Sequence, residues 1–407
     1  MVANASGEAP ATTSSAGELQ TLIVVSAAHL VSHLHIMVLP VLLPLLKERM
    51  NVGFFELGLA LTTFNIVSGL TQAPMGFLVD RIGARRVLIA GLLLGGAAFV
   101  SLAMSGSYGW LFVVAVLAGL ANCVYHPADY AILTDSIPEN RVGRAFSVHT
   151  FAGFVGSAIA PPLLLGLAAV AGLNSSVVAA GLVAWAIAAL VFLIPDQQRA
   201  RREQRAKANA AGASVSVFTP AILGLTVFFT LLALSHSAMY SFAIVALLAG
   251  HGVTLTVATA AVTAYLTGSA VGVLLGGPVA DRTRRHGDVA AAGFAISAFI
   301  SLAIAVFNLP VVLLIAAMGV VGVVIGMVQP SRDMLVRRSA PPGAAGRVFG
   351  IVSTGFNIGG IFGPLLFGWL MDSNQPRWIF GAAVVFMLAT ALYAAFEDRG
   401  SRPRAAA

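Results

Sequence analysis

The feature that most constrains the fold is a series of long segments without charged side chains. Residues 20–46, 57–79 and 145–171 contain no Asp, Glu, Lys or Arg. A helix needs roughly 20 apolar residues to cross the hydrocarbon core of a bilayer, and in lipid the backbone must satisfy its own hydrogen bonds. These runs are continuous rather than alternating, which argues against barrel strands. The segments therefore predict an all-α membrane protein.

Twelve such segments can be placed, six on either side of one hydrophilic stretch. The predicted helices lie near residues 20–46, 57–79, 86–105, 109–133, 145–171, 174–194, 219–249, 255–280, 288–307, 310–335, 348–371 and 378–396. We expect two membrane domains, 20–195 and 217–397, joined by a cationic linker at 196–216. Residues 1–19 are expected to form a disordered cytoplasmic tail, and residues 398–407 a second tail.

Basic residues are distributed unequally between the two ends of these helices. With twelve spans, 19 of the 23 Lys and Arg residues fall on the side of the linker and the termini, and three fall on the other side. The positive-inside rule then places both termini and the linker in the cytoplasm. Topology thus accounts for the net charge of +7, and no nucleic-acid partner is expected.

The two halves of the chain repeat each other at an offset of about 200 residues. Ser32-His33 recurs as Ser235-His236, and Gly143-Arg144 recurs as Gly346-Arg347. A duplicated unit with an even number of helices has the same orientation in both copies. The two units are then related by an axis along the membrane normal.

The loop after the second predicted helix has a recognisable sequence, GFLVDRIGARR at Gly76–Arg86, with a degenerate copy at Gly277–Gly287. It resembles the signature loop of the major facilitator superfamily. The resemblance implies two pseudo-symmetric six-helix bundles, the major facilitator fold, and secondary transport by alternating access. We expect Gly76 to allow close helix approach, Asp80 to cap a helix N-terminus, and the cytoplasmic gate to comprise Gly76, Asp80, Arg81, Arg85, Asp135, Arg144, Asp281, Arg282 and Arg347.

A Gly/Pro-rich segment in the fifth helix, GFVGSAIAPPLL, resembles the antiporter motif of drug–proton antiporters in this superfamily. The copy in the eleventh helix, GFNIGGIFGPLL, is nearly as good a match, so helix packing common to both halves is the alternative interpretation. The packing residues of the two segments are Gly153, Gly156, Pro161, Gly359 and Pro364.

A narrower resemblance covers roughly the N-terminal half. Residues 26–50, 55–80 and 122–130 are similar to the fosmidomycin-resistance subgroup of bacterial efflux proteins. The acidic residue that directly follows His-Pro in that subgroup is replaced by Ala128 in this chain, and Asp129 comes one position later.

Ionisable side chains inside membrane helices are rare and usually functional. In this superfamily the first, fourth, seventh and tenth helices line the central cavity. The candidates for proton coupling and substrate contact on them are His29, His33, His126, Asp129, His236, Gln329 and Arg332. Histidine titrates near pH 6.5 and can carry a proton. The alternative for each is a neutral histidine, or an amide, that bridges helices. His149 lies on the fifth helix, and His35 is expected to point away from the cavity.

Asp129 and Arg332 occupy equivalent positions of the fourth and tenth helices and have opposite charge. Three interpretations remain open: a latch that closes the cytoplasmic side, an Arg332 that binds an anionic substrate, and a static structural role. Asp333 is expected to pair with Arg337, four residues further on.

The sequence contains no metal-ligand cluster, nucleophile–base pair or phosphate loop, so neither an enzyme nor a cofactor is expected. Cys123, the only cysteine, cannot form an intrachain disulfide. The sequence predicts a monomeric multi-pass transporter of a bacterial inner membrane, which exports a small amphipathic or anionic molecule coupled to protons. The alternative is a proton symporter or organic-anion exchanger that imports a metabolite.

Overall fold

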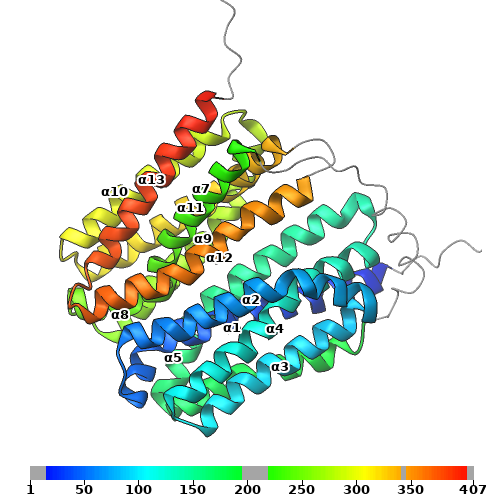
Figure 1. Ribbon diagram of the computed structural model, residues 1–407, viewed down its shortest axis with the longest axis horizontal. Helices are drawn as coiled ribbons and strands as arrows, with labels where there is room; N and C mark the ends of the chain where they lie inside the picture. Colours follow the sequence, from blue (N-terminus) through cyan, green and yellow to red (C-terminus); the bar gives the residue numbers. More distant parts are fainter. Residues whose placement is uncertain (1–14, 195–218, 341–344, 401–407) are drawn as a thin grey trace, which may run out of the picture.

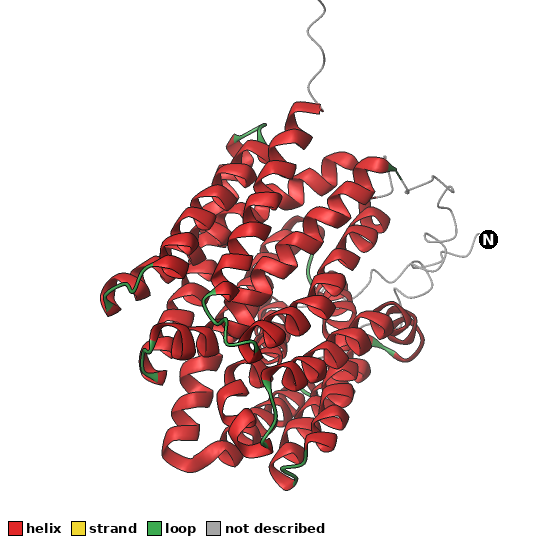
Figure 2. Ribbon diagram, turned by 60° about the vertical axis from the view of Figure 1, so that its left-hand side comes forward, coloured by secondary structure: helices red, strands yellow, loops and turns green. Residues whose placement is uncertain are grey.

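The computed structural model describes residues 15–194, 219–340 and 345–400, and every regular element in these ranges is a helix (Figures 1 and 2). The elements are α1 (Ser15–Met50), α2 (Phe54–Ile82), α3 (Ala84–Met104), α4 (Tyr108–Ser136), α5 (Glu139–Val191), α7 (Pro220–Ser237), η1 (Ala238–Phe242), α8 (Ala243–His251), α9 (Leu255–Arg282), α10 (His286–Val306), α11 (Val311–Ser339), α12 (Ala345–Asp372) and α13 (Trp378–Gly400).

Twelve membrane crossings follow from these helices. In the described ranges, 11 helical segments are long and apolar enough to span a bilayer. One of them, α5, has 53 residues and contains a break at Gly172, with φ 83° and ψ 163°. Glycine adopts this positive φ without the steric penalty that a Cβ would bring. The two arms of α5 therefore correspond to the predicted fifth and sixth helices, and α7, η1 and α8 together form one crossing.

The crossings form two bundles, α1 to α5 and α7 to α13, which lie side by side in Figure 1. Within the first bundle α1 packs on α5 and α3 packs on α4 and α5. Within the second, α9 packs on α11, α10 on α13, and α7 on α12. The main contacts between the bundles are α2 with α12 and α5 with α9. The prediction of two pseudo-symmetric six-helix bundles is confirmed.

The chain ends differ from the prediction in part. Helix α1 begins at Ser15, so residues 15–19 are helical rather than part of a disordered tail. Glu18 lies in the first turn, where a carboxylate interacts favourably with the helix dipole, and it forms an ion pair with Arg141 at 2.7 Å. Helix α13 runs to Gly400, past the predicted boundary at 397. Residues 1–14, the linker 196–216 and residues 401–407 lie outside the described residues.

Helices α2 and α12 touch closely over half of their length. A Cβ on Gly58 would lie 2.4 Å from the Pro364 carbonyl oxygen, and one on Gly368 would lie 2.6 Å from that of Phe54. The Thr62 hydroxyl donates to the Ile361 carbonyl at 2.8 Å. These contacts join the N-terminal half of α2 to the C-terminal half of α12.

Asp372 completes the junction at one end of the molecule. Its carboxylate accepts hydrogen bonds from the backbone amides of Phe54 and Phe55, at 2.9 and 2.7 Å, and lies 3.8 Å from the Lys47 ammonium. The first amides of a helix have no partner within the helix. A residue of the second bundle thus caps α2 in the first bundle and holds the two halves together at this end.

The opposite end, where α2 and α9 finish in the motifs around Asp80 and Asp281, is called the signature-loop end. A Cβ added to Gly76 would meet no atom within 4 Å, and the same holds for Gly277. The expected close approach at Gly76 is therefore absent, because the tight α2–α12 contact is confined to the Asp372 end. The halves are closed at the Asp372 end and separate toward the signature-loop end.

Candidate functional site

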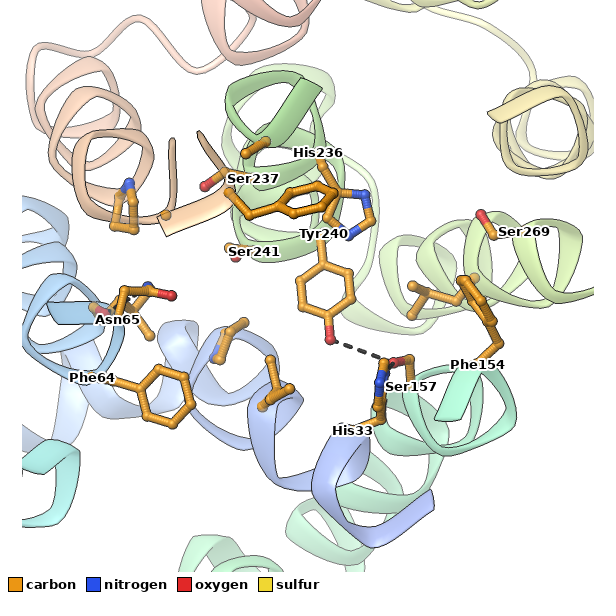
Figure 3. A pocket seen from close by; sticks show the side chains of 18 of the residues that line it. His33, Phe64, Asn65, Phe154, Ser157, His236, Ser237, Tyr240, Ser241 and Ser269 are labelled. Atoms are coloured by element: carbon orange, nitrogen blue, oxygen red, sulfur yellow. Dashed lines mark hydrogen bonds between the residues drawn. The ribbon is translucent and has the colours of Figure 1, made fainter. Parts of the chain in front are cut away.

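A cavity of about 380 Å³ lies between the two bundles (Figure 3). Its walls are His33, Ile36, Pro40, Leu61, Phe64, Asn65, His126, Phe154, Ser157, Ala233, His236, Ser237, Tyr240, Ser241, Leu266, Ser269, Phe356, Gly360 and Pro364. No Asp, Glu, Lys or Arg is among these lining residues. The cavity therefore offers a cation no fixed counter-charge, whereas its three imidazoles become positive when protonated.

The wall from the second bundle is shaped by the π-helical turn η1 within the seventh crossing. Such turns are rare and occur frequently at functional sites. The turn places Tyr240 beside His236, with ring centroids 4.7 Å apart, and both side chains face the cavity in Figure 3. The Tyr265 hydroxyl lies 3.3 Å from His236 Nδ1.

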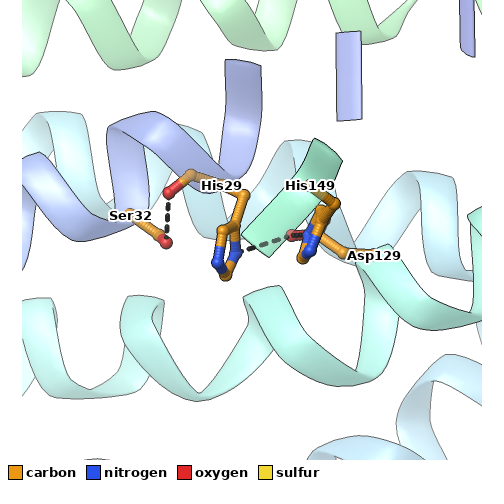
Figure 4. Close-up of polar contacts among 4 residues, drawn as sticks. All are labelled: His29, Ser32, Asp129 and His149. Atoms are coloured by element: carbon orange, nitrogen blue, oxygen red, sulfur yellow. Dashed lines mark hydrogen bonds and ion pairs between the residues drawn. The ribbon is translucent and has the colours of Figure 1, made fainter. Parts of the chain in front are cut away.

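The first bundle contains what we call the histidine–aspartate cluster, formed by His29, His33, His126, Asp129 and His149. Asp129 has 0% exposure, and its Oδ2 atom lies 3.0 Å from His149 Nε2 and 3.6 Å from His29 Nδ1 (Figure 4). The ring of His29 lies between the others, with centroids 3.8 Å from His149, 4.7 Å from His33 and 5.3 Å from His126. Two members, His33 and His126, also line the cavity, so the cluster connects the buried carboxylate to it.

Several polar atoms of this cluster have no hydrogen-bond partner among the described residues: Nδ1 of His29, Nδ1 of His149 and Oδ1 of Asp129. Buried polar groups are usually paired, and leaving one unpaired is costly. Such atoms can accept or release a proton without breaking an existing hydrogen bond. The ligand atoms of His29, Asp129 and His149 are also close enough for one metal ion, within 4.8 Å of each other, whereas the sequence predicts no metal-ligand cluster.

Arg332 lies apart from Asp129, and no contact between the two is found among the described residues. The guanidinium of Arg332 packs over the rings of Phe229 and Phe356, at 5.1 and 5.5 Å from their centroids. Its Nε and Nη2 atoms donate to Asp333 Oδ1 at 2.9 and 2.7 Å. The expected Asp333–Arg337 pair is therefore wrong, because the long Arg332 side chain folds back to reach its neighbour. The latch is untested by this conformation, and exchanging the two charges decides between a latch and a proton-binding role for Asp129.

The other candidate residues are placed as follows. Gln329 does not line the cavity, and His35 points away from it, toward the Phe99 ring and the Ala180 carbonyl. Two further amides lie between α2 and α12: Asn65, which also lines the cavity, lies against Gly360, and Asn357 lies against Gly69.

The signature-loop residues are mostly exposed. Asp80, Arg81, Arg144, Asp281 and Arg282 all have exposed side chains, and the N-terminus of α3 has no side-chain cap, so Asp80 does not cap it. Arg85 instead donates to the carbonyls of Val191, at 3.1 Å, and Phe192, at the C-terminal end of α5. Asp135 is half-buried, and the side chain of Arg347 lies outside the described residues.

The Gly/Pro-rich segments of α5 and α12 lie where helices approach closely. A Cβ on Gly156 would lie 2.1 Å from the Leu30 carbonyl oxygen, and one on Gly153 would lie 2.6 Å from the His29 ring. A Cβ on Gly359 would lie 2.4 Å from Ala233. Pro161 and Pro364 lie within α5 and α12. The glycines of α5 thus allow α1, with its histidines, to pack against α5.

Three residues of the site are not singled out by the sequence: His149, Ser157 and Tyr240. His149 lies on the fifth helix, outside the set expected to line the cavity, yet it makes the shortest contact to Asp129. Its presence in the charge-free run 145–171 is a signal that could have identified it. Ser157 and Tyr240 carry no comparable signal.

A helical membrane protein made of two six-helix bundles around a central cavity has the architecture of a secondary transporter. The chain belongs to the Major Facilitator Superfamily, whose profile matches residues 25–248 and 226–407. It is therefore a multi-pass membrane transporter of small molecules and not an enzyme.

Several known proteins are similar over most of the chain. The fosmidomycin resistance protein of Escherichia coli (strain K12) is 25% identical over 394 residues, which cover 92% of each chain. The multidrug resistance protein MdtH of Aeromonas hydrophila is 26% identical over 341 residues, covering 80% of this chain and 83% of that protein. The inward-facing, occupied structure of a bacterial homolog of the human lysosomal transporter Spinster superimposes with a TM-score of 0.78 at 15% identity, covering 97% of this chain and 100% of that one. The first two relatives are of efflux type, and the third shares the fold.

Proposed function

We propose that the protein exports a small amphipathic or anionic molecule in exchange for protons, by alternating access across a bacterial inner membrane. The observation that carries the proposal is the placement of Asp129. This fully buried carboxylate contacts His149 and His29, and these connect through ring contacts to His33 and His126 in the cavity wall. Buried ionisable groups in transporters commonly form such proton relays.

The charge of the cavity supports the cargo class. A cavity with three imidazoles and no carboxylate can match an anion when a histidine is protonated, while Phe64, Phe154 and Phe356 supply apolar surface. We infer that the bound molecule is amphipathic or anionic rather than a permanent cation.

The separation of the halves at the signature-loop end identifies the side from which the cavity is reached in this conformation. If the positive-inside rule orients the chain as predicted, with both termini in the cytoplasm, the cavity in this conformation is reached from the cytoplasm. In the proposed export, cargo is loaded from the cell interior in this conformation, and the Asp372 end must open to release it.

Import of an organic anion is the second candidate. Arg332 supports an anionic cargo for either direction of transport, because its guanidinium lies over the cavity-lining Phe356 and can contact an anion. The probable sulfoacetate transporter SauU of Cupriavidus necator is 30% identical, but only over 34% of this chain.

The direction of transport separates the two candidates. Everted membrane vesicles with an acidic lumen are offered compounds in the medium, beginning with fosmidomycin because of the Escherichia coli relative. An exporter accumulates its cargo in the lumen and releases protons to the medium, which dissipates the pH gradient. An importer accumulates its cargo only in right-side-out vesicles, and that result would contradict the proposal.

A further inference from the structure

We propose that Ser157 and Tyr240 are positioning residues that tie the protonation of His33 to the side on which the cavity opens. The inference rests on the proposed proton coupling. It concerns a hydrogen-bond chain that crosses from one bundle to the other inside the cavity.

The chain has three members. The Tyr240 hydroxyl lies 3.4 Å from Ser157 Oγ, and Ser157 Oγ lies 3.1 Å from His33 Nδ1 (Figure 3). Tyr240 belongs to η1 of the second bundle, whereas Ser157 and His33 belong to α5 and α1 of the first. Ser157 is 2% exposed, so its hydroxyl depends on these two neighbours.

The direction in which these three groups donate their hydrogen bonds depends on whether His33 is protonated. A hydroxyl has one proton to donate. When Tyr240 donates to Ser157, the Ser157 proton is directed to His33 Nδ1, which can accept it only if the imidazole is neutral at that atom. A protonated His33 must instead donate to Ser157. Ser157 Oγ then either accepts from Tyr240 as well or turns its own proton toward Tyr240. In both cases one hydroxyl proton, of Ser157 or of Tyr240, needs an acceptor outside these three groups, in a cavity that has no carboxylate among its lining residues. The intact chain thus favours neutral His33.

The relative position of the two bundles determines whether this hydrogen-bond chain forms. At 3.4 Å the contact between Tyr240 and Ser157 is near the limit of a hydrogen bond, so a small rocking movement breaks it. Once it is broken, Ser157 is free to accept from a protonated His33. The conformation that is open at the signature-loop end therefore releases the proton, and the opposite conformation takes it up. This alternation is what proton antiport requires.

Other ionisable groups also surround His33. They are His29 on α1, His126 and Asp129 on α4, His149 on α5, and His236 and Tyr240 on the seventh crossing. The His29 ring lies between His33 and Asp129, 4.7 Å from the His33 ring centroid and with Nδ1 3.6 Å from Asp129 Oδ2, so the carboxylate also influences the proton on His33. The experiment must therefore change Tyr240 and Ser157 while leaving these groups in place.

The test measures the conformational equilibrium without any cargo. Spin labels are attached at Asn140→Cys and Arg337→Cys, both exposed and on different halves near the signature-loop end, in a full-length Cys123→Ala background. Distances are recorded by electron double resonance in nanodiscs from pH 5 to pH 8. One linked proton changes the ratio of open to closed states by up to about ten-fold per pH unit. We expect the labelled protein that retains Tyr240, Ser157 and His33 to open at the signature-loop end as the pH rises.

Tyr240→Phe and Ser157→Ala should reduce this dependence to about two-fold per pH unit or less, because they uncouple the proton from the conformation. Ser157→Thr, which keeps a hydroxyl, should retain it. The matched control is Tyr108→Phe, which removes a hydroxyl bonded to the Glu56 carbonyl outside the cavity and should behave as the protein with the intact chain does. If Tyr240→Phe does not fold, the pair Ser157→Ala and Ser157→Thr decides.

Two outcomes would overturn the proposal, and they differ in meaning. In the first, the conformation of the labelled protein depends on pH, and Tyr240→Phe and Ser157→Ala show the same dependence. The hydrogen-bond chain then has no coupling role, although proton coupling itself stands. If the protein with the intact chain does not respond to pH at all, the chain and the proposed proton coupling both fail.

Discussion

At the scale of single residues, Asp129 has 0% exposure and two imidazoles as its nearest polar neighbours. A charge in this position is tolerated only if a neighbour carries the opposite charge or a proton is bound. The number of protons that the cluster binds should therefore change when any one of its side chains is replaced. Residue-level substitutions in the cluster are the most direct way to test this.

Asp129→Asn and His149→Gln should abolish proton-driven transport, by at least about 100-fold, while exchange of cargo across the membrane continues. Each substitution nearly keeps the side-chain volume but removes a proton-binding group. His33→Ala and His126→Ala, in the cavity wall, should have the same effect. Proton-driven uptake and counterflow are compared in proteoliposomes, with His251→Gln as the control because His251 lies at the end of α8, outside the cluster.

The exchange of charges between Asp129 and Arg332 gives a second prediction. Asp129→Arg would bury a guanidinium beside His29 and His149, so the double variant Asp129→Arg with Arg332→Asp should be as inactive as the worse single variant. Transport by the three variants is compared in proteoliposomes. Partial recovery by the double variant would instead support a latch between the two side chains and contradict a proton-binding role for Asp129.

Only part of the site could be predicted from single residues. The four-residue spacing of His29 and His33 on one helix predicts their contact, and Asp129 is conspicuous in an apolar helix. The partnership of Asp129 with His149 depends on how α1, α4 and α5 pack. No local sequence pattern predicts which faces of these three helices meet.

At the scale of elements, the junction of α2 and α12 determines which end of the cavity is closed. The cap from Asp372 to α2 contributes to that junction, and loss of a helix cap costs about 0.5–2 kcal/mol. Asp372→Ala should therefore shift the equilibrium roughly 2- to 30-fold toward opening at the Asp372 end. The spin-label pair at positions 140 and 337 reports this shift as closure of the signature-loop end. Glu48→Ala, an exposed carboxylate near the same end, should leave the equilibrium unchanged.

Close packing of α1 on α5 leads to a prediction about stability. Gly156→Ala puts a methyl group about where the Leu30 carbonyl lies, and such overpacking costs about 1–3 kcal/mol. Its thermal midpoint, followed by tryptophan fluorescence in detergent, should fall by several degrees. Gly76→Ala, where a Cβ meets nothing within 4 Å, should be as stable as the wild type. Equal midpoints for the two variants would show that α1 and α5 are not closely packed at Gly156.

The helices themselves were largely predictable because a membrane span is defined by length and apolarity, both of which can be read directly from the sequence. Their ends were less so, as the start of α1 at Ser15 and the end of α13 at Gly400 show. No residue pattern in the sequence marks the π-helical turn at Ala238–Phe242.

At the scale of the whole molecule, closure at one end and separation at the other are the two requirements of alternating access. The duplicated sequence predicts two rocking units, but it does not predict which end is closed. That depends on the small difference between two sets of contacts between the bundles, among them the α2–α12 junction and the Tyr240–Ser157 hydrogen bond. A few side-chain contacts determine so small a free-energy difference, and the repeat pattern of the sequence does not reveal it.

Exchange of cargo for protons that bind at the histidine–aspartate cluster can be measured directly. Acid-filled everted vesicles receive an exported compound in the medium, and proton release is recorded with a pH-sensitive dye for the wild type and Asp129→Asn. We expect release by the wild type and none by Asp129→Asn, although the variant still exchanges labelled for unlabelled compound. Equal proton release by both proteins would show that the cluster does not carry the exchanged protons.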